Sequence, residues 1–190
     1  KNLFGCLDAY EKCSEFDKKN EFLLENKINE IKFRNFVFYV GYFNLQNGKA
    51  EAAYNSFERC LNYANYYKLV ASEPAVLNDS TIDRAEVAYL ACMAAYQMKD
   101  YKKIAAHISD AMNYDKDIET VRQLHLMSLL ETGDTLQWAT VARDYAKHDE
   151  GIAQNLLSHY SRKGENEEAL KFADQLLETN PYNKIANYAK

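Results

Sequence analysis

The stretch that decides the fold runs from Gly164 to Pro181 and reads Gly-Glu-Asn-Glu-Glu-Ala-Leu-Lys-Phe-Ala-Asp-Gln-Leu-Leu-Glu-Thr-Asn-Pro. It begins at a break, Gly164-Glu165, between two segments in which apolar residues recur at helical spacing. Similar breaks occur earlier in the chain, at Asn47-Gly48, Lys99-Asp100 and Gly133-Asp134. Counted from Gly48, equivalent positions are 51, 34 and 31 residues apart. The middle spacing equals that of a helical-hairpin repeat of about 34 residues, and the first equals it plus about 17 inserted residues.

The composition favours helices over sheets. The 190 residues include only 6 Gly and 2 Pro, whereas a many-stranded sandwich or barrel needs such residues at every tight turn. The hydrophobic share of 47% is enough for a core, and the length fits one domain or one repeat array. The formal net charge of −5 argues against a nucleic-acid partner, which demands clustered Lys and Arg. There is no run of about 18 apolar residues, so we expect no membrane insertion.

In these features the chain resembles the tetratricopeptide repeat family, most closely in its last unit. The residues of that unit at or next to the signature positions of the family are Leu156, Leu157, Tyr160, Gly164, Ala169, Phe172, Leu176, Leu177 and Pro181. The first full unit keeps Val37, Val40, Gly41, Gly48, Ala53, Phe57 and Cys60, and the second keeps Ala88, Ala91, Cys92, Asp100, Tyr101, Ile108 and Ala111. The resemblance implies an all-α fold, a right-handed solenoid of antiparallel helix pairs.

We therefore expect residues 1–190 to form a single repeat array. Its parts are a partial repeat at 1–19, a first full repeat with a long first helix at 20–65, an insertion loop at 66–81, a second repeat at 82–116, a third, degenerate repeat at 117–148, a fourth repeat at 149–181 and the start of a further helix at 182–190. The β-rich string Phe36–Val40 suggests a strand when taken alone, but its helical flanks favour one helix from Asn20 to about Leu45.

Small residues in each hairpin allow its two helices to approach closely, and larger ones fill the space towards the next hairpin. The third unit departs from this pattern. Trp138 stands where a small residue is usual, and Ala142 stands one turn later where a large one is usual. Residues four apart are neighbours on a helix face, so we interpret this as an exchange of volume and expect a wider helix crossing there.

Searches for catalytic and cofactor motifs find none, so we expect no enzyme activity, no cofactor and no metal. The four histidines share no ligand spacing, and we expect His125 to be a hydrogen-bonded core imidazole. The cysteines form no CxxC pair. If they lie on one helix, as we expect, the spacing of seven residues places Cys6 and Cys13 about 10 Å apart along its axis, too far for a disulfide. We interpret these two, with Cys60 and Cys92, as small buried hydrophobic residues.

The resemblance implies that the first helix of each hairpin lines a concave groove. Carried onto this chain, the positions are Asn35, Phe38 and Tyr42; Glu86, Tyr89, Met93 and Tyr96; Thr120, Gln123 and Met127; and Gln154, Ser158 and Arg162. Aromatic rings and Met beside amides suit adaptable peptide binding. The alternative is that Phe38, Tyr42 and Tyr89 pack against the long N-terminal helix. The Lys- and Asn-based clamp that some family members use for a C-terminal carboxylate looks absent.

We thus expect a non-catalytic scaffold that binds a peptide or protein segment on its concave face. The alternatives are a self-associating structural module, part of a larger repeat array, and, third, a small enzyme. The chain opens at Lys1 without Met, which suggests that a signal peptide or other upstream sequence has been removed. The resemblance is closest to repeat proteins of the bacterial cell envelope, so we expect the envelope or periplasm, with the cytoplasm as the alternative.

Overall fold

The computed structural model describes residues 5, 9, 12, 21–62 and 82–189; of residues 21–33 and 179 it describes the backbone alone. The described residues form helices and turns, with no strand among them, so the chain is all-α. It divides into two compact units, residues 1–116 (unit 1) and 117–190 (unit 2). The expected insertion at 66–81 lies outside the described residues, as does the partial repeat at 1–19 apart from three isolated positions.

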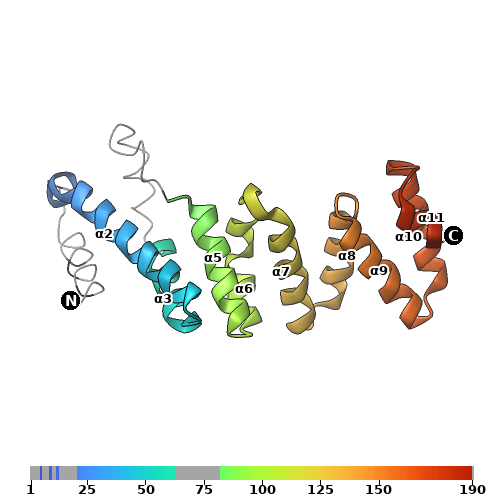
Figure 1. Ribbon diagram of the computed structural model, residues 1–190, viewed down its shortest axis with the longest axis horizontal. Helices are drawn as coiled ribbons and strands as arrows, with labels where there is room; N and C mark the ends of the chain where they lie inside the picture. Colours follow the sequence, from blue (N-terminus) through green and yellow to red (C-terminus); the bar gives the residue numbers. More distant parts are fainter. Residues whose placement is uncertain (1–4, 6–8, 10–11, 13–20, 63–81, 190) are drawn as a thin grey trace. The chain divides into compact units, whose positions relative to one another are not determined.

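Unit 1 contains four described helices: α2 (Glu21–Gln46), α3 (Ala50–Leu61), α5 (Arg84–Gln97) and α6 (Tyr101–Ala111). Each packs against the next along the chain, and α2 also contacts α5 (Figure 1). The long first helix is present as α2, which includes the string Phe36–Val40. This string is helical although its residues favour a strand. Val37 and Phe38 are buried, and their packing outweighs the weak local preference for a strand.

Unit 2 contains α7 (Ile118–Glu131), α8 (Thr135–Ala146), α9 (Glu150–Lys163), α10 (Asn166–Thr179) and the short α11 (Lys184–Ala189), preceded by a 3-10 turn at Asp115–Asp117. Here too each helix packs against the next, and α11 also reaches α9 (Figure 1). The core draws on all five helices through Leu126, Leu129, Trp138, Ala142, Ala146, Ile152, Ala153, Leu156, Leu157, Tyr160, Phe172, Ala173, Leu176 and Ala186.

The four breaks in the sequence are four turns of one geometry. Gly48, Gly133 and Gly164 have φ of 70°, 85° and 74°, and Lys99 has φ of 57°. At each turn this residue donates its N–H to the carbonyl three residues back, and the next residue donates to the carbonyl five back. This is the Schellman ending, which satisfies the last carbonyls of a helix and needs a left-handed residue. The sequence therefore located the turns correctly, including the one without glycine.

Lys99→Gly should raise the free energy of unfolding by about 1 kcal/mol, because a side chain at a left-handed position is strained and glycine is not. Chemical denaturation followed by circular dichroism measures the change. The matched control is Ala105→Gly at an exposed position within α6, which should lower the same free energy by about 1 kcal/mol. An equal loss of stability in both variants would show that the turn at Lys99 does not require this backbone conformation.

The two residues of the predicted volume exchange in the third helix pair, α7 and α8, are both buried. Trp138 is 8% exposed and Ala142 is fully buried in the core of unit 2. The helices α7 and α8 pack against each other less extensively than α5 and α6 do, but so do α9 and α10, and the wider crossing of the third pair therefore stays a prediction.

The buried cysteines behave as small apolar side chains. Cys60 and Cys92 are free, buried thiols, and burial raises the pKa of each to about 12. Both point their sulfur atoms at main-chain carbonyls, those of Arg34 and Ile104, at 3.7 and 3.8 Å. The prediction for these two positions is confirmed, whereas Cys6 and Cys13 lie outside the described residues.

Candidate functional site

The predicted groove residues of unit 1 fall into three groups by burial. Phe38 is only 6% exposed, and its ring lies 5.9 Å from that of Phe57. It is a core residue, so its assignment to an open groove is corrected: this position of α2 faces α3. Tyr42 and Tyr96 are 43% and 40% exposed. The other positions, which are partly buried, are Asn35, Glu86, Tyr89 and Met93.

Tyr89 does not stand free at the surface of unit 1. Its ring stacks on that of Tyr114, with 4.8 Å between centroids and 20° between planes. The most exposed aromatic rings of unit 1 lie one residue further along the same stretch of α2, where Phe36, Tyr39 and Phe43 are each more than 60% exposed. The sequence signal for these three is their spacing of three and four residues, which places them on one helix face.

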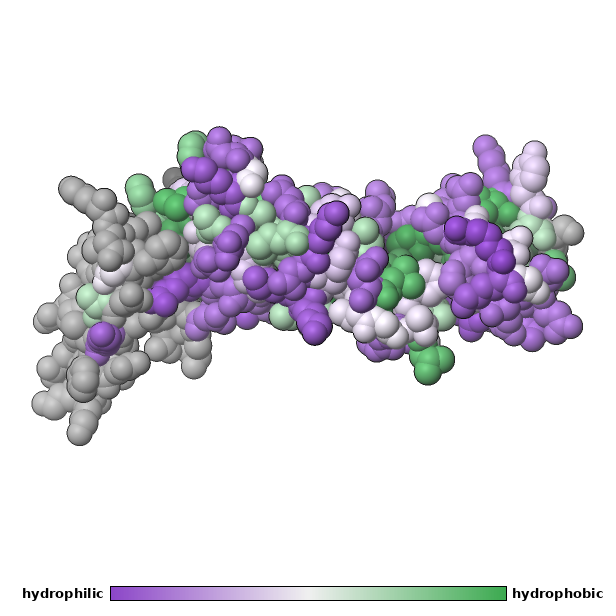
Figure 2. Space-filling view, turned by 90° about the horizontal axis from the view of Figure 1, so that it is seen from below, coloured by the Kyte–Doolittle hydropathy of each residue, from purple (hydrophilic) through white to green (hydrophobic). Residues whose placement is uncertain are grey.

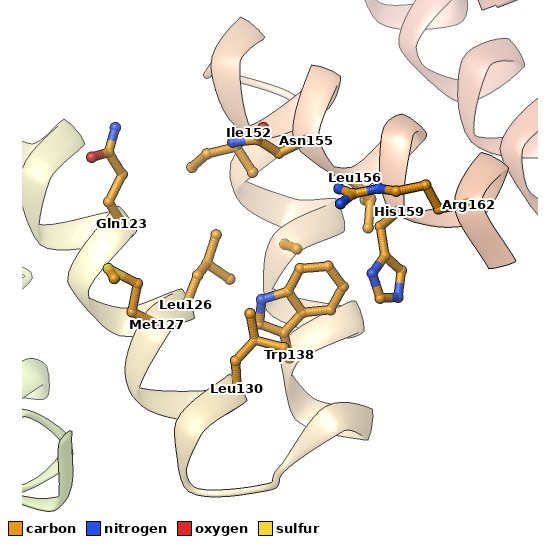
Figure 3. Close-up of a pocket in the computed structure, with 11 residues that line it drawn as sticks. Gln123, Leu126, Met127, Leu130, Trp138, Ile152, Asn155, Leu156, His159 and Arg162 are labelled. Atoms are coloured by element: carbon orange, nitrogen blue, oxygen red, sulfur yellow. The ribbon is translucent and has the colours of Figure 1, made fainter.

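Unit 2 brings three of the predicted residues together in one pocket of about 570 Å³. Gln123 and Met127 come from α7, and Arg162 comes from the last turn of α9 (Figure 3). Gln154 and Ser158 do not line this pocket. They line, again with Arg162, a second one against α10 and α11. Thr120 lines neither.

The floor and walls of the first pocket, which we call the α7–α9 pocket, are apolar. Trp138 of α8 lies at its base (Figure 3). The centroid of its ring lies 4.7 Å from that of the His159 ring. Its buried indole N–H has no hydrogen-bond partner among the described residues. The remaining apolar lining consists of Leu126, Leu130, Ala142, Ile152 and Leu156. In Figure 2, hydrophobic residues gather over the part of the chain that holds α7 and α8, amid a mainly hydrophilic surface.

Polar groups stand at the rim of the α7–α9 pocket. Gln123 and Asn155 face it from α7 and α9 (Figure 3), and both are exposed. The Arg162 Nε donates to the main-chain oxygen of Ser158 at 3.2 Å, and Figure 3 shows the guanidinium reaching over Leu156 towards the pocket. No acidic residue lines the pocket.

Two histidines of unit 2, His125 and His159, have pKa values below the ordinary value of histidine. His125 Nδ1 lies 2.7 Å from the Tyr145 hydroxyl oxygen, and burial lowers the pKa of His125 below its ordinary value. The predicted hydrogen bond is confirmed, whereas the predicted place in the core is corrected, because the imidazole is only half-buried. Burial, followed by the charge of Lys163, also lowers the pKa of His159. A neutral imidazole packed on Trp138 extends the apolar wall.

A further polar cluster ties α3 to α6 in unit 1. The Tyr54 hydroxyl lies 3.1 Å from a carboxylate oxygen of Glu58 and 3.0 Å from His107 Nε2. Lys103 lies over the Tyr54 ring at 4.6 Å. Burial, reinforced by Glu58, raises the pKa of Tyr54. These groups partner one another across the helix interface, as expected of a structural contact.

Two further classes of site were sought in the part of the chain that the structure describes. It contains no group of three or more His, Cys, Asp or Glu side chains placed to hold a metal ion. Nor does a helix in that part have the length and apolar character needed to cross a bilayer.

Sequence reasoning missed two polar members of the α7–α9 pocket, Asn155 and His159. The sequence pattern that could have identified them is their spacing. Together with Ile152 and Arg162 they lie three, four and three residues apart along α9, which places all four on one helix face. The repeat-based assignment chose Gln154 and Ser158, one residue earlier in each case. One residue turns a helical position by about 100°, so this small offset selects a different face.

Comparison of the chain with protein-family models, with curated proteins and with solved structures finds no match.

Proposed function

We propose that the chain is a right-handed solenoid of antiparallel helix pairs, similar to tetratricopeptide arrays, and that it is a non-catalytic scaffold. Two observations support the architecture. The four helix-ending turns share one hydrogen-bond pattern, and within each unit every helix packs against the next. Repetition of one local geometry is the property that defines an array of stacked hairpins.

We further propose that the scaffold binds an extended peptide or protein segment, and the α7–α9 pocket carries this proposal. In the repeat assignment, α7 and α9 are the first helices of consecutive hairpins, and α8 supplies the floor between them. A volume of about 570 Å³ is in the range of ligand-binding pockets. The apolar base of the pocket suits an inserted side chain of the peptide, and the amides at its rim suit the peptide backbone.

Gln123→Ala should weaken peptide binding by about 1–2 kcal/mol, because the amide can hydrogen-bond the backbone of an extended segment. A library of short random peptides displayed on phage and selected against the purified chain supplies the ligand, and calorimetric titration measures its affinity. Helical circular dichroism should stay unchanged, since Gln123 is exposed.

The controls for this experiment are Glu51→Ala on α3 and Lys171→Ala on α10, both at exposed positions. They should change affinity little, because exposed charges contribute weakly. Failure to select any peptide, or equal affinity in Gln123→Ala and wild type, would contradict the proposal.

Tyr42→Ala and Tyr89→Ala extend the same titration to unit 1. If α2 and α5 take part in binding, each variant should lose about 1–2 kcal/mol of affinity with the helical signal intact. Because the Tyr89 ring stacks on that of Tyr114, Tyr89→Ala removes a contact within the fold as well as a groove residue. Loss of folding in this variant would place Tyr89 in the core instead.

Self-association, or stacking of further repeats, is a second candidate, favoured by the surface of α10 and α11. Leu170, Tyr182 and Tyr188 are 44%, 89% and 95% exposed there, and the second pocket lies between α9 and these helices. Light scattering over a range of concentrations tests it. A rise in mass with concentration that Tyr188→Ser abolishes would favour association, and a constant monomer mass would count against it.

A further inference from the structure

We propose that the α7–α9 pocket selects a peptide segment in which an apolar side chain is followed or preceded closely by a carboxylate. The apolar side chain enters the pocket, and the carboxylate pairs with Arg162. This inference rests on the proposed function and names the chemistry of the partner.

Charge complementarity is the first support. Arg162 is the one lining residue that carries a charge when His159 is neutral, and the lining contains no carboxylate. The structure places no described acidic side chain within ion-pair distance of Arg162, in contrast to Arg143, which pairs with Glu168 at 3.0 Å. A carboxylate brought by the ligand would supply that partner, in the planar fork geometry that guanidinium groups favour.

The neighbouring charges point in the same direction. Of the charged groups that act on the pKa of His159, Lys163 and Arg162 lower it and Glu165 raises it. An anionic ligand is therefore attracted to this end of α9. Lys163 does not line the pocket, and it can supply long-range attraction without contact.

The apolar part of the ligand is defined by the base of the pocket. Aliphatic side chains from α7 and α9 surround Trp138, and the adjacent His159 ring presents an uncharged face. A Leu, Ile, Met or Phe side chain of the ligand would be removed from water there, and a polar side chain would lose its hydration without a matched partner.

The two amides fix the backbone of the segment. Gln123 and Asn155 stand on different helices, on either side of the apolar base (Figure 3). Each offers a donor and an acceptor. Amides on two helices that flank a groove can hold an extended backbone from both edges, which orients its side chains alternately into and away from the pocket.

The test is selection of the same random peptide library against three proteins: wild type, Arg162→Glu and Lys163→Glu. Wild type should enrich peptides with an acidic residue within two positions of an aliphatic or aromatic one. Arg162→Glu should lose this preference and enrich basic residues at the same place. Lys163→Glu carries the same change of charge one residue away and should keep the acidic preference.

Synthetic peptides from the wild-type selection make the test quantitative. Replacing the acidic residue of the peptide by its amide should weaken binding to wild type by about tenfold or more. The same replacement should not weaken binding to Arg162→Glu and should strengthen it, because it removes the repulsion between two carboxylates. Replacing its apolar residue by Ser should weaken binding to both proteins by about tenfold or more.

The outcomes separate this inference from the proposed function. Enriched peptides that lack an acidic preference, or an acidic preference that survives in Arg162→Glu, would overturn the inference and leave peptide binding in place. If no peptide is enriched by any of the three proteins, both are overturned. A preference lost equally in Arg162→Glu and Lys163→Glu would show a diffuse charge effect and would also overturn the specific pairing.

Discussion

Trp138→Ala should lower the free energy of unfolding by about 3–5 kcal/mol. The indole is 8% exposed in the core of unit 2, and it fills the space that smaller residues would occupy in a closer helix pair. Truncation removes the buried rings and leaves a cavity beneath the α7–α9 pocket. Because natural domains are stable by only about 5–15 kcal/mol in total, the loss should appear as a much earlier midpoint in urea denaturation.

Two control variants show whether the loss of stability in Trp138→Ala comes from removal of the buried rings. Leu136→Ala lies two residues away on α8 and removes an apolar side chain that is 85% exposed, so it should change stability by less than about 0.5 kcal/mol. Trp138→Phe keeps one ring and removes the unpaired N–H, so it should lose much less than Trp138→Ala. A melting curve of Trp138→Ala equal to that of wild type would mean that the indole does not fill the core.

Gly41→Leu should lower the free energy of unfolding of unit 1 by about 1–3 kcal/mol through overpacking. A Cβ atom at Gly41 would lie 2.8 Å from Phe57 Cε1 and 2.9 Å from Ser56 Cβ, and real Cβ atoms essentially never approach other atoms so closely. The substitution therefore forces α2 away from α3. Thermal and urea denaturation both measure the loss.

The control for Gly41→Leu is Ala52→Leu, which replaces a methyl by an isobutyl side chain at an exposed position of α3 and should be nearly neutral. The free energy of unfolding of Gly41→Ala should lie between those of wild type and Gly41→Leu, because the added Cβ atom already meets Phe57. Equal stability of Gly41→Leu and wild type would show that α2 and α3 do not approach at this point.

Much of the fold could be predicted from the sequence because the turns are local. Gly48, Gly133 and Gly164 end helices through backbone geometry that glycine favours, and the sequence shows them directly. Lys99 could be placed only through its spacing from Gly133. The helix at Phe36–Val40 required the argument from its flanks, since its own residues favour a strand.

The candidate site was predicted only in part because it depends on helix rotation and on the position of one large side chain. Gln123, Met127 and Arg162 were identified by their positions in the repeat. Phe38 was misassigned to the surface, because an offset of one residue along α2 turns a position from solvent to core. The depth of the pocket depends on where Trp138 lies relative to α7 and α9, which no periodicity in the sequence specifies.

Trp138 offers the most direct test of peptide binding at the α7–α9 pocket, because it is the single tryptophan of the chain and lies at the base of that pocket. Its fluorescence therefore reports on this pocket alone. Titration of a selected peptide without tryptophan should change the emission, and the change should saturate together with binding measured by calorimetry. Binding that saturates without any change in Trp138 emission, and that Gln123→Ala leaves intact, would place the peptide elsewhere and contradict the central claim.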